Sequence, residues 1–240
     1  MKKIIALLLT LLVFAGCGKK EKIDDTVKWI NGTYAVFTVI NNGDINEIGG
    51  FKKTPETVQS VKDMLKEWWG ITNREEADNA VEWLMNEGHR KDFLQSYYAN
   101  ELQNLSREEL NENLEKLSKE DKVYYTLLFN AYEKYGEDAV TGWDYSRAVQ
   151  LLGYYYLADY YTYEETMDKS LAVSRQIQKT FSSWDDFVQS YLYGYQYWND
   201  DDIEQKGSSS YNRAETYKKI KAMSNSPYKL DWKMELKKSW

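Results

Sequence analysis

The sequence of 240 residues is acidic, since 31 lysine and arginine residues stand against 38 aspartate and glutamate residues and give a formal net charge of −7 at pH 7. A chain of this kind without a basic stripe is poorly suited to nucleic acid, whose phosphates require clustered lysine and arginine. Its single cysteine leaves no partner for an intramolecular disulfide and no cysteine cluster for a metal. We therefore expect neither a nucleic-acid partner nor a disulfide-stapled fold.

The first residues have the pattern of a bacterial lipoprotein signal. Lys2 and Lys3 supply positive charge, and the apolar run over residues 4–14 is short for a membrane span. Ala15–Cys17 then places two small residues directly before the only cysteine, the order that a lipoprotein signal peptidase reads. We expect Cys17 to become the lipidated first residue of the mature chain, anchored in the membrane by its acyl chains. The alternatives are an ordinary signal peptide with an incidental cysteine, or a short anchor helix.

This signal predicts both the organisation of the chain and its location. Residues 1–16 are expected to be the signal peptide, and residues 17–28 the lipidated cysteine and a short charged tether. In residues 29–240 no repeat period and no internal linker marks a second domain. We expect one domain at the extracytoplasmic face of the cell membrane, with an unknown envelope protein or cell-wall component as its partner.

Aromatic residues are abundant, with 9 tryptophans, 21 tyrosines and 7 phenylalanines. Tyrosine and tryptophan pack a core while keeping one polar atom available, so this richness compensates for a modest aliphatic content. The same side chains also suit a surface that binds sugars or peptides. We expect most of these rings in the core, with a specific aromatic binding face as the alternative.

Helix start and stop signals follow one another and predict an all-α fold of about eight helices. Thr54 before Pro55 is typical of an N-terminus, and Gly70 of a C-terminus. The stretch Thr72–Glu75 has the spacing of a capping box, and Gly88 is expected to close the helix that the box starts. Further N-caps are expected at Ser106, Ser118, Thr162, Ser183 and Ser210.

Two segments have a special character. Residues 142–160 are apolar around most of a helix circumference, which is typical of a central helix. Residues 27–40 are ambiguous, because they are rich in strand formers and fit a hairpin. However, Ile30, Tyr34 and Phe37 recur at the spacing of a helix. We favour the helix for this segment.

Three stretches carry a resemblance to a known family through their order and spacing: Trp68 to Ala77, Trp83 to Arg90, and Gly142 to Ala148 with Ser182 to Gly194. Together they resemble a bacterial family known only as domain of unknown function family 1266, over roughly residues 29–198. No activity comes with the family. The resemblance implies a mostly helical domain, which supports the helix for residues 29–40, and it leaves the tether and the basic residues 229–238 outside.

The resemblance also implies a common site or core around two short motifs, Gly-His-Arg and Asp-x-x-Arg. The family motifs contribute a set of large and small residues to that core. These are Trp69, Gly70, Trp83, Gly88, Trp143 and Trp184.

His89 is the only histidine and follows Gly88 at the expected helix end. A cation there interacts favourably with the negative end of the helix dipole, as does Arg90, and we interpret both residues first in this way. The alternative makes His89 a general base, because histidine titrates near physiological pH, although no local motif supplies a nucleophile or an orienting group. Without a second histidine or a free cysteine we expect no metal site, and we expect no cofactor.

Asp144 and Arg147 are three residues apart, so on a helix they share a face and can pair. Both border the most apolar segment of the chain, where His89 or Arg90 would complete a network. We interpret these residues first as a buried structural network, in which loss of one partner would cost about 3–5 kcal/mol. The alternative is a ligand site, in which the planar guanidinium of Arg147 binds an anion or a carboxylate.

These observations favour binding over catalysis, and no catalytic residue is assigned. The leading hypothesis is a membrane-anchored module that binds an envelope partner, because aromatic residues are plentiful and no catalytic constellation is visible. A hydrolase or transferase that uses Asp144, Arg147 and His89 is the second hypothesis. A small-ligand receptor in a helical pocket is the third.

Overall fold

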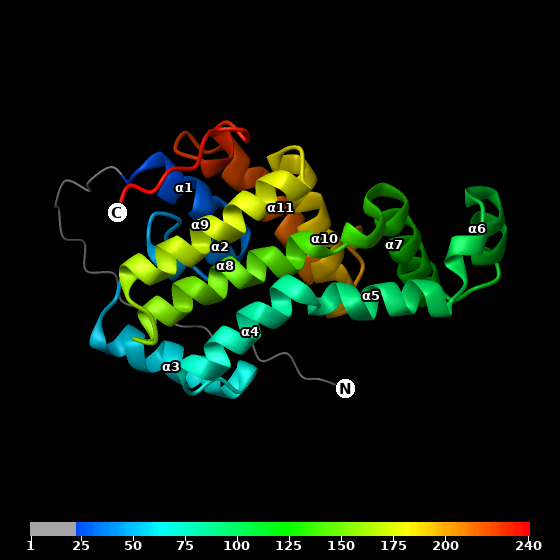
Figure 1. Cartoon of the computed structure of the whole chain (residues 1–240). Helices are drawn as coiled ribbons and strands as arrows, with labels where there is room; N and C mark the ends of the chain where they lie inside the picture. The colour runs from blue at the N-terminus through cyan, green and yellow to red at the C-terminus, as the bar shows by residue number, and fades with distance from the viewer. Residues whose placement is uncertain (1–22) are drawn as a thin grey trace.

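The computed structural model describes residues 23–240 and shows an all-α fold, as the helix signals predict (Figure 1). The predicted signal peptide and Cys17 lie outside the described residues. Within residues 23–240 there is no strand, and no helix combines the length and apolar character that crossing a membrane requires. The α-helices are α1 (Asp25–Gly32), α2 (Ala35–Ile40), α3 (Pro55–Trp69), α4 (Arg74–Asn86), α5 (Gly88–Ala99), α6 (Arg107–Leu114), α7 (Lys119–Tyr135), α8 (Thr141–Leu157), α9 (Tyr163–Thr180), α10 (Trp184–Asn199) and α11 (Ser209–Ala222).

Helix α8 is the centre of the fold. Every residue of this helix except Arg147 and Tyr156 is buried, and α8 packs most extensively against α10, α9 and α4. Gly142 allows the close approach of α10, because a Cβ there would lie 2.7 Å from backbone atoms of Phe187 and Tyr191. The prediction of a central helix from its apolar circumference is confirmed.

Buried apolar side chains form two clusters. The larger surrounds α8 and takes in side chains of α1 to α4 and of α9 to α11. The smaller lies mainly among α5, α6 and α7, where Phe93, Leu110 and Leu128 are buried. Figure 1 shows these three helices as an arm that extends from the helices around α8.

Most helices begin and end where the sequence predicts. The Thr54 side chain accepts a hydrogen bond from the Thr57 N–H at the start of α3, and Gly70 ends that helix in the left-handed conformation with φ 67°. Ser106 forms the predicted capping box with Glu109 at the start of α6. The N-caps of α7, α9 and α10 are Ser118, Thr162 and Ser183, as predicted.

Two predicted N-caps are wrong by one or two residues. Helix α4 starts after Asn73, whose side chain accepts a hydrogen bond from the Glu76 N–H. The Glu76 carboxylate accepts in turn from the N–H and the hydroxyl of Thr72, so the predicted box is displaced by one residue. Helix α11 starts after Ser208 rather than Ser210, because the Ser208 hydroxyl accepts the hydrogen bond from the first turn.

The helix predicted for residues 29–40 is correct, but it is divided into the short helices α1 and α2. Tyr34 lies at the break between them and is buried. Its hydroxyl donates to Asn31 Oδ1 at 2.6 Å and accepts from the Gly49 N–H at 3.2 Å. Burial raises the pKa of Tyr34, so this hydroxyl keeps its proton as a donor across the ordinary pH range.

The segment after α11 packs back onto α1. Trp232 is 7% exposed and forms a triad with Trp29 of α1 and Trp184 of α10, in which the ring centroids are 4.6 to 5.2 Å apart. Further along, the Lys237 N–H donates to the Thr26 hydroxyl at 3.3 Å. The basic C-terminal segment is therefore part of the packed fold.

Candidate functional site

The junction between α4 and α5 differs from the prediction. Gly88 does not close a helix, because α4 ends at Asn86 and α5 starts at Gly88 itself. His89 therefore lies at a helix N-terminus, where backbone N–H groups lack partners and the dipole is positive. The interpretation of His89 as a cation at a helix C-terminus is wrong for this reason. A negative charge would stabilise this N-terminus of α5.

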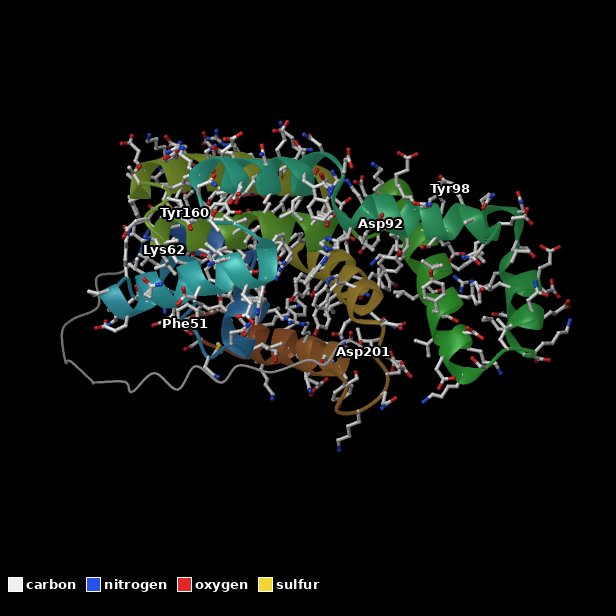
Figure 2. The ribbon with its side chains drawn as sticks, turned by 90° about the horizontal axis from the view of Figure 1, so that it is seen from below. Phe51, Lys62, Asp92, Tyr98, Tyr160 and Asp201 are labelled. Atoms are coloured by element: carbon white, nitrogen blue, oxygen red, sulfur yellow. The ribbon has the colours of Figure 1, made fainter. Side chains whose placement is uncertain are left out.

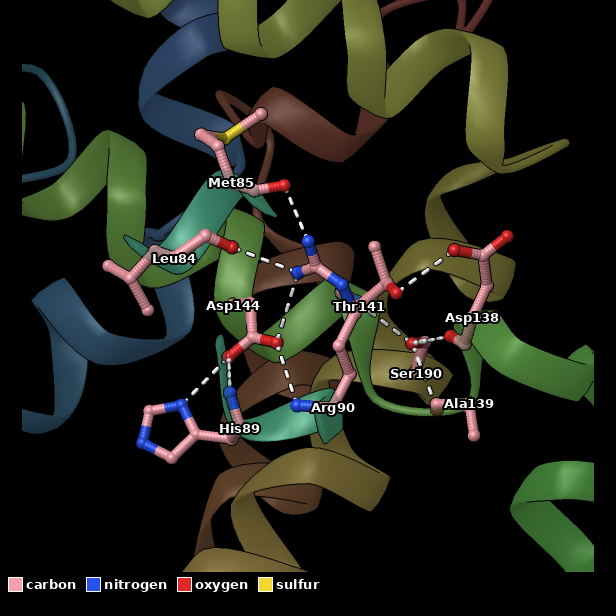
Figure 3. A network of polar contacts seen from close by, with 10 residues as sticks. Leu84, Met85, His89, Arg90, Asp138, Ala139, Thr141, Asp144 and Ser190 are labelled. Carbon is pink, nitrogen blue, oxygen red and sulfur yellow. Dashed lines mark hydrogen bonds and ion pairs between the residues drawn. The ribbon is translucent and has the colours of Figure 1, made fainter. Parts of the chain in front are cut away.

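Asp144 of α8 supplies that charge (Figure 3). Its fully buried carboxylate accepts hydrogen bonds from the backbone N–H groups of His89, at 2.8 Å, and Arg90, at 3.1 Å. The same carboxylate contacts their side chains, with His89 Nδ1 at 2.7 Å and Arg90 Nη1 at 3.3 Å. One carboxylate of α8 thus caps α5 and holds two of its side chains.

Arg90 connects the end of α4 to this carboxylate. Its guanidinium donates to the carbonyl oxygens of Leu84 and Met85, in the last turn of α4, so for Arg90 the predicted role at a helix C-terminus is correct. Gly88 makes the junction possible, because its φ is +58° and a Cβ there would lie 2.3 Å from Asp144 Oδ2. Three helices therefore meet around a single ion pair.

His89 is oriented by Asp144 as a base is oriented in catalytic pairs. Because Nδ1 faces the carboxylate, the other ring nitrogen is left for further partners, and 19% of the side chain is exposed. The ring lies 5.1 Å from the ring of Trp83 and 6.0 Å from that of Trp143. Among the described residues no hydroxyl forms a hydrogen bond with this ring. The orienting group that the local sequence lacks is therefore present, but no nucleophile contacts the histidine.

Arg147 does not form the predicted ion pair with Asp144. Its guanidinium carbon lies instead among aromatic rings, 4.7 Å from Trp69, 5.1 Å from Trp143 and 5.8 Å from Phe37. Its side-chain hydrogen bond, a long one of 3.4 Å, goes to the neutral Gln150, and its Nε is buried without a partner. Burial, together with repulsion from a second arginine, lowers the pKa of Arg147 to about 10.

The second arginine is Arg213 of α11, which sequence reasoning misses. Its side chain donates to the Tyr191 hydroxyl at 2.9 Å, its guanidinium carbon lies 3.7 Å from the ring of Tyr195, and its Nε also lacks a partner. Only 8% of Arg213 is exposed. The signal that could have found it is the spacing of the buried face of α11, which consists of Ser210, Arg213, Tyr217 and Ile220.

Four tryptophans form a series of ring contacts with His89 and Arg147, and we call Trp69, Trp83, Trp143 and Trp198 the tryptophan cluster. They are linked through the ring of Trp143, which lies 5.9 Å from that of Trp198, and through the contacts of His89 and Arg147. Trp198 is 56% exposed and Trp83 is 38% exposed, so the cluster reaches the surface. Trp184, another residue of the family motifs, lies apart from it in the triad with Trp29.

The site therefore combines three parts with different chemistry. The Asp144 network is a compensated set of charges. The two arginines are cations without acidic partners among the described residues. The tryptophan cluster contacts His89 and Arg147. Within residues 23–240 no group of three or more His, Cys, Asp or Glu side chains is placed to hold a metal ion. Such an arrangement can bind an anionic or flat ligand through cations and indole rings.

Comparison with known proteins assigns a family but no activity. No curated protein and no solved structure matches the chain. A family model described as Protein of unknown function (DUF1266) matches residues 64–232. The resemblance in the sequence covers roughly residues 29–198. The family match starts later, at residue 64, and ends later, at residue 232, so it includes α11 and Trp232. Because it covers well over half of the chain, the protein belongs to the DUF1266 family of proteins of unknown function.

Proposed function

We propose that the chain is a lipid-anchored binding protein at the extracytoplasmic face of a bacterial membrane, which contacts an envelope partner or ligand through the tryptophan cluster. The anchor is supported by the order of positive charge, apolar run and small residues that ends in Cys17. The binding role is supported by the geometry of the site. The two parts of the proposal are independent and are tested separately.

The observation that carries the binding role is the exposure of Trp198 and Trp83 above one connected group of rings. Their exposed fractions are 56% and 38%, although burial of an indole ring away from water is energetically favourable. The two residues are joined through Trp143 and His89 rather than scattered over the surface. Tryptophan is also among the residues that contribute most to affinity when an interface buries them. Exposed aromatic side chains that are connected in this way are typical of a binding face.

The polar residues of the site favour binding over catalysis. Asp144 is engaged by four donors at a helix junction, so its charge is already used by the fold. Arg90 is held by two backbone carbonyls of α4 as well as by Asp144. Among the described residues no hydroxyl contacts His89 as a nucleophile would.

Mass spectrometry of the membrane fraction tests the anchor. We expect a mature N-terminus at Cys17 that carries acyl chains, because the residues before it have the order that the signal peptidase reads. The variant Cys17→Ala should lose the lipid and leave the membrane fraction. Mature protein that retains Met1 would contradict the anchor.

Capture of partners from the protein's own envelope, with a cross-linker, tests the binding face. We expect Trp198→Ala to reduce capture by about tenfold, because truncation of a central aromatic contact costs about 1–2 kcal/mol or more. Tyr163→Ala is the matched control, since Tyr163 is a 40% exposed aromatic residue outside the tryptophan cluster. Equal capture by both variants and the unchanged chain would contradict the proposal.

The pair of His89 and Asp144 supports a second candidate, a hydrolase or transferase. The specific observation is the 2.7 Å contact between His89 Nδ1 and Asp144 Oδ1, together with the partial exposure of the imidazole. Turnover of p-nitrophenyl esters or p-nitrophenyl phosphate tests it. Activity of the unchanged chain that His89→Gln lacks would replace the binding role with a catalytic one.

A further inference from the structure

The fold brings Arg147 of α8 and Arg213 of α11 to one aromatic ring. Each guanidinium carbon lies 5.8 Å from the ring centroid of Phe37. Arg147 also lies 4.7 Å from the ring of Trp69, and Arg213 lies 3.7 Å from that of Tyr195. Two helices that are far apart in the sequence thus each place a guanidinium group next to the ring of Phe37.

No acidic side chain of residues 23–240 forms an ion pair with either arginine. Their hydrogen-bond partners there are neutral, Gln150 for Arg147 and the hydroxyl of Tyr191 for Arg213. In both residues the Nε is buried and has no partner. A guanidinium has five N–H donors, so each residue keeps donors that an incoming acceptor can use.

Three other arginines of the described chain have a carboxylate partner, whereas Arg175 donates to the backbone carbonyl of Leu236. Arg74, Arg90 and Arg107 each contact a carboxylate, which belongs to Glu165, Asp144 and Glu133 respectively. Buried positive charge without a counter-ion is unfavourable, and two such charges also repel each other. Stability alone therefore does not explain why this pair is enclosed together.

Solvent reaches this place at Arg147. Its side chain is surrounded by rings yet remains partly exposed, as does the neighbouring Trp69 at the end of α3. Figure 2 shows α3, α10 and α11 from below, with their side chains. An anion therefore reaches the site first at the exposed part of Arg147, whereas Arg213 is only 8% exposed.

We propose that Arg147 and Arg213 bind the oxyanion group of a small ligand, a carboxylate or a phosphate, whose flat body lies against Trp69. A planar guanidinium donates two parallel hydrogen bonds to such a group. The anion supplies the missing counter-charge and accepts bonds from donors that are now unpaired. Indole rings favour contact with a flat apolar body. The inference rests on the proposed binding function and names the ligand chemistry for it, but it does not depend on the lipid anchor.

The test measures the melting temperature of the full chain, purified in detergent, with sodium benzoate, phenyl phosphate or benzamide at equal ionic strength. Benzamide has the shape of benzoate without its charge. We expect one or both anions to raise the melting temperature with saturation, because a ligand that binds only the folded state stabilises it. The anion that acts at the lower concentration identifies the group as a carboxylate or a phosphate. No rise with either anion beyond the rise with benzamide would overturn the proposal.

Variants assign the effect to the two arginines. Arg147→Lys and Arg213→Lys keep the charge but lose the planar fork, and we expect the half-saturating anion concentration to rise roughly tenfold or more. Arg107→Lys is the control, since Arg107 is exposed and pairs with Glu133, and it should respond as the unchanged chain does. A full response in Arg147→Lys would show that the anion binds elsewhere.

The outcome can be separated from that of the proposed function. If Trp198→Ala abolishes partner capture while no anion stabilises the unchanged chain, the binding function stands and the anion site is refuted. If the anion response depends on Arg147 while Trp198→Ala leaves capture unchanged, the anion site stands and the tryptophan cluster is refuted as the partner surface.

Discussion

Asp144 and Arg147 lie one turn apart on α8, yet their surroundings are opposite: Asp144 is fully buried, and Arg147 is partly exposed. The Asp144 carboxylate accepts four hydrogen bonds and faces the guanidinium of Arg90. Arg147 makes one side-chain hydrogen bond, at 3.4 Å, to a neutral partner. The first charge is explained by the stability of the helix junction. The second is not explained in that way.

This difference teaches that burial alone does not identify a functional group. Removing one partner from a buried charge whose hydrogen bonds are all made is destabilising. The contribution of such a charge to stability is therefore enough to explain its presence. A buried charge with donors left over requires another explanation. Burial lowers the pKa of Arg147 to about 10, so its surroundings disfavour the charged form, although the residue still carries its charge at neutral pH.

The largest loss of stability is expected at Asp144, whose charge is compensated by its partners. Asp144→Asn leaves two backbone N–H groups and two cationic or ring donors facing an amide, and we expect the free energy of unfolding to fall by about 3–5 kcal/mol. Urea denaturation measures it. Asp185→Asn is the control, because Asp185 is 64% exposed and its ion pair with Lys221 should contribute about 1 kcal/mol or less. A similar small loss in both variants would remove the contrast.

A smaller loss is expected from Gly88→Ala, which leaves every charge in place. The new Cβ would lie 2.3 Å from Asp144 Oδ2 and occupy a left-handed backbone, so we expect a loss of about 2–4 kcal/mol from steric overlap and strain. Gly70→Ala separates these two causes. Gly70 has φ +67°, but a Cβ added there would meet no atom within 4 Å, so strain alone should cost about 1–2 kcal/mol. Equal losses would show that the contact with Asp144 is unimportant.

The smallest loss of stability is expected for replacement of Arg147, and its comparison with replacement of Arg90 is the most informative. Arg90→Met removes hydrogen bonds to Asp144, Leu84 and Met85, and we expect a loss of about 2–3 kcal/mol. Arg147→Met removes cation–π contacts together with an uncompensated charge, so the two contributions offset and stability should change by about 1 kcal/mol or less. Thermal and urea unfolding compare the two variants directly. A loss for Arg147→Met as large as that for Arg90→Met would identify Arg147 as a structural residue.

Much of the fold follows from local signals in the sequence. Ser106, Ser118 and Thr162 mark helix starts because a hydroxyl accepts a hydrogen bond within the first turn, an interaction that depends only on neighbouring residues. The central position of α8 follows from its apolar circumference. The error at Gly88 is also informative. The role of this glycine between two helices depends on Asp144, which lies on a different helix and is not a neighbour in the sequence.

The site could be predicted less well than the fold. The motifs indicated His89, Arg90 and Asp144, and the structure brings these residues together, but spacing on one helix wrongly paired Asp144 with Arg147. That error arises because i and i+3 neighbours compete with partners from other helices, which the sequence does not place. The sequence does not indicate Arg213 for the same reason. Its contact with Phe37, which Arg147 also contacts, joins residues of different helices.

The triad of Trp29, Trp184 and Trp232 joins residues from the two ends of the described chain. Helix α1 is synthesised long before Trp232, which is one of its main packing partners. Contacts of such long sequence separation form slowly, and exposed aromatic surface favours aggregation while they are missing. A nascent chain that stops before Trp232 would hold most of its helices with Trp29 still partly uncovered. Truncation of the segment after α11 should therefore expose the protein to aggregation, even though it removes none of the helices around α8.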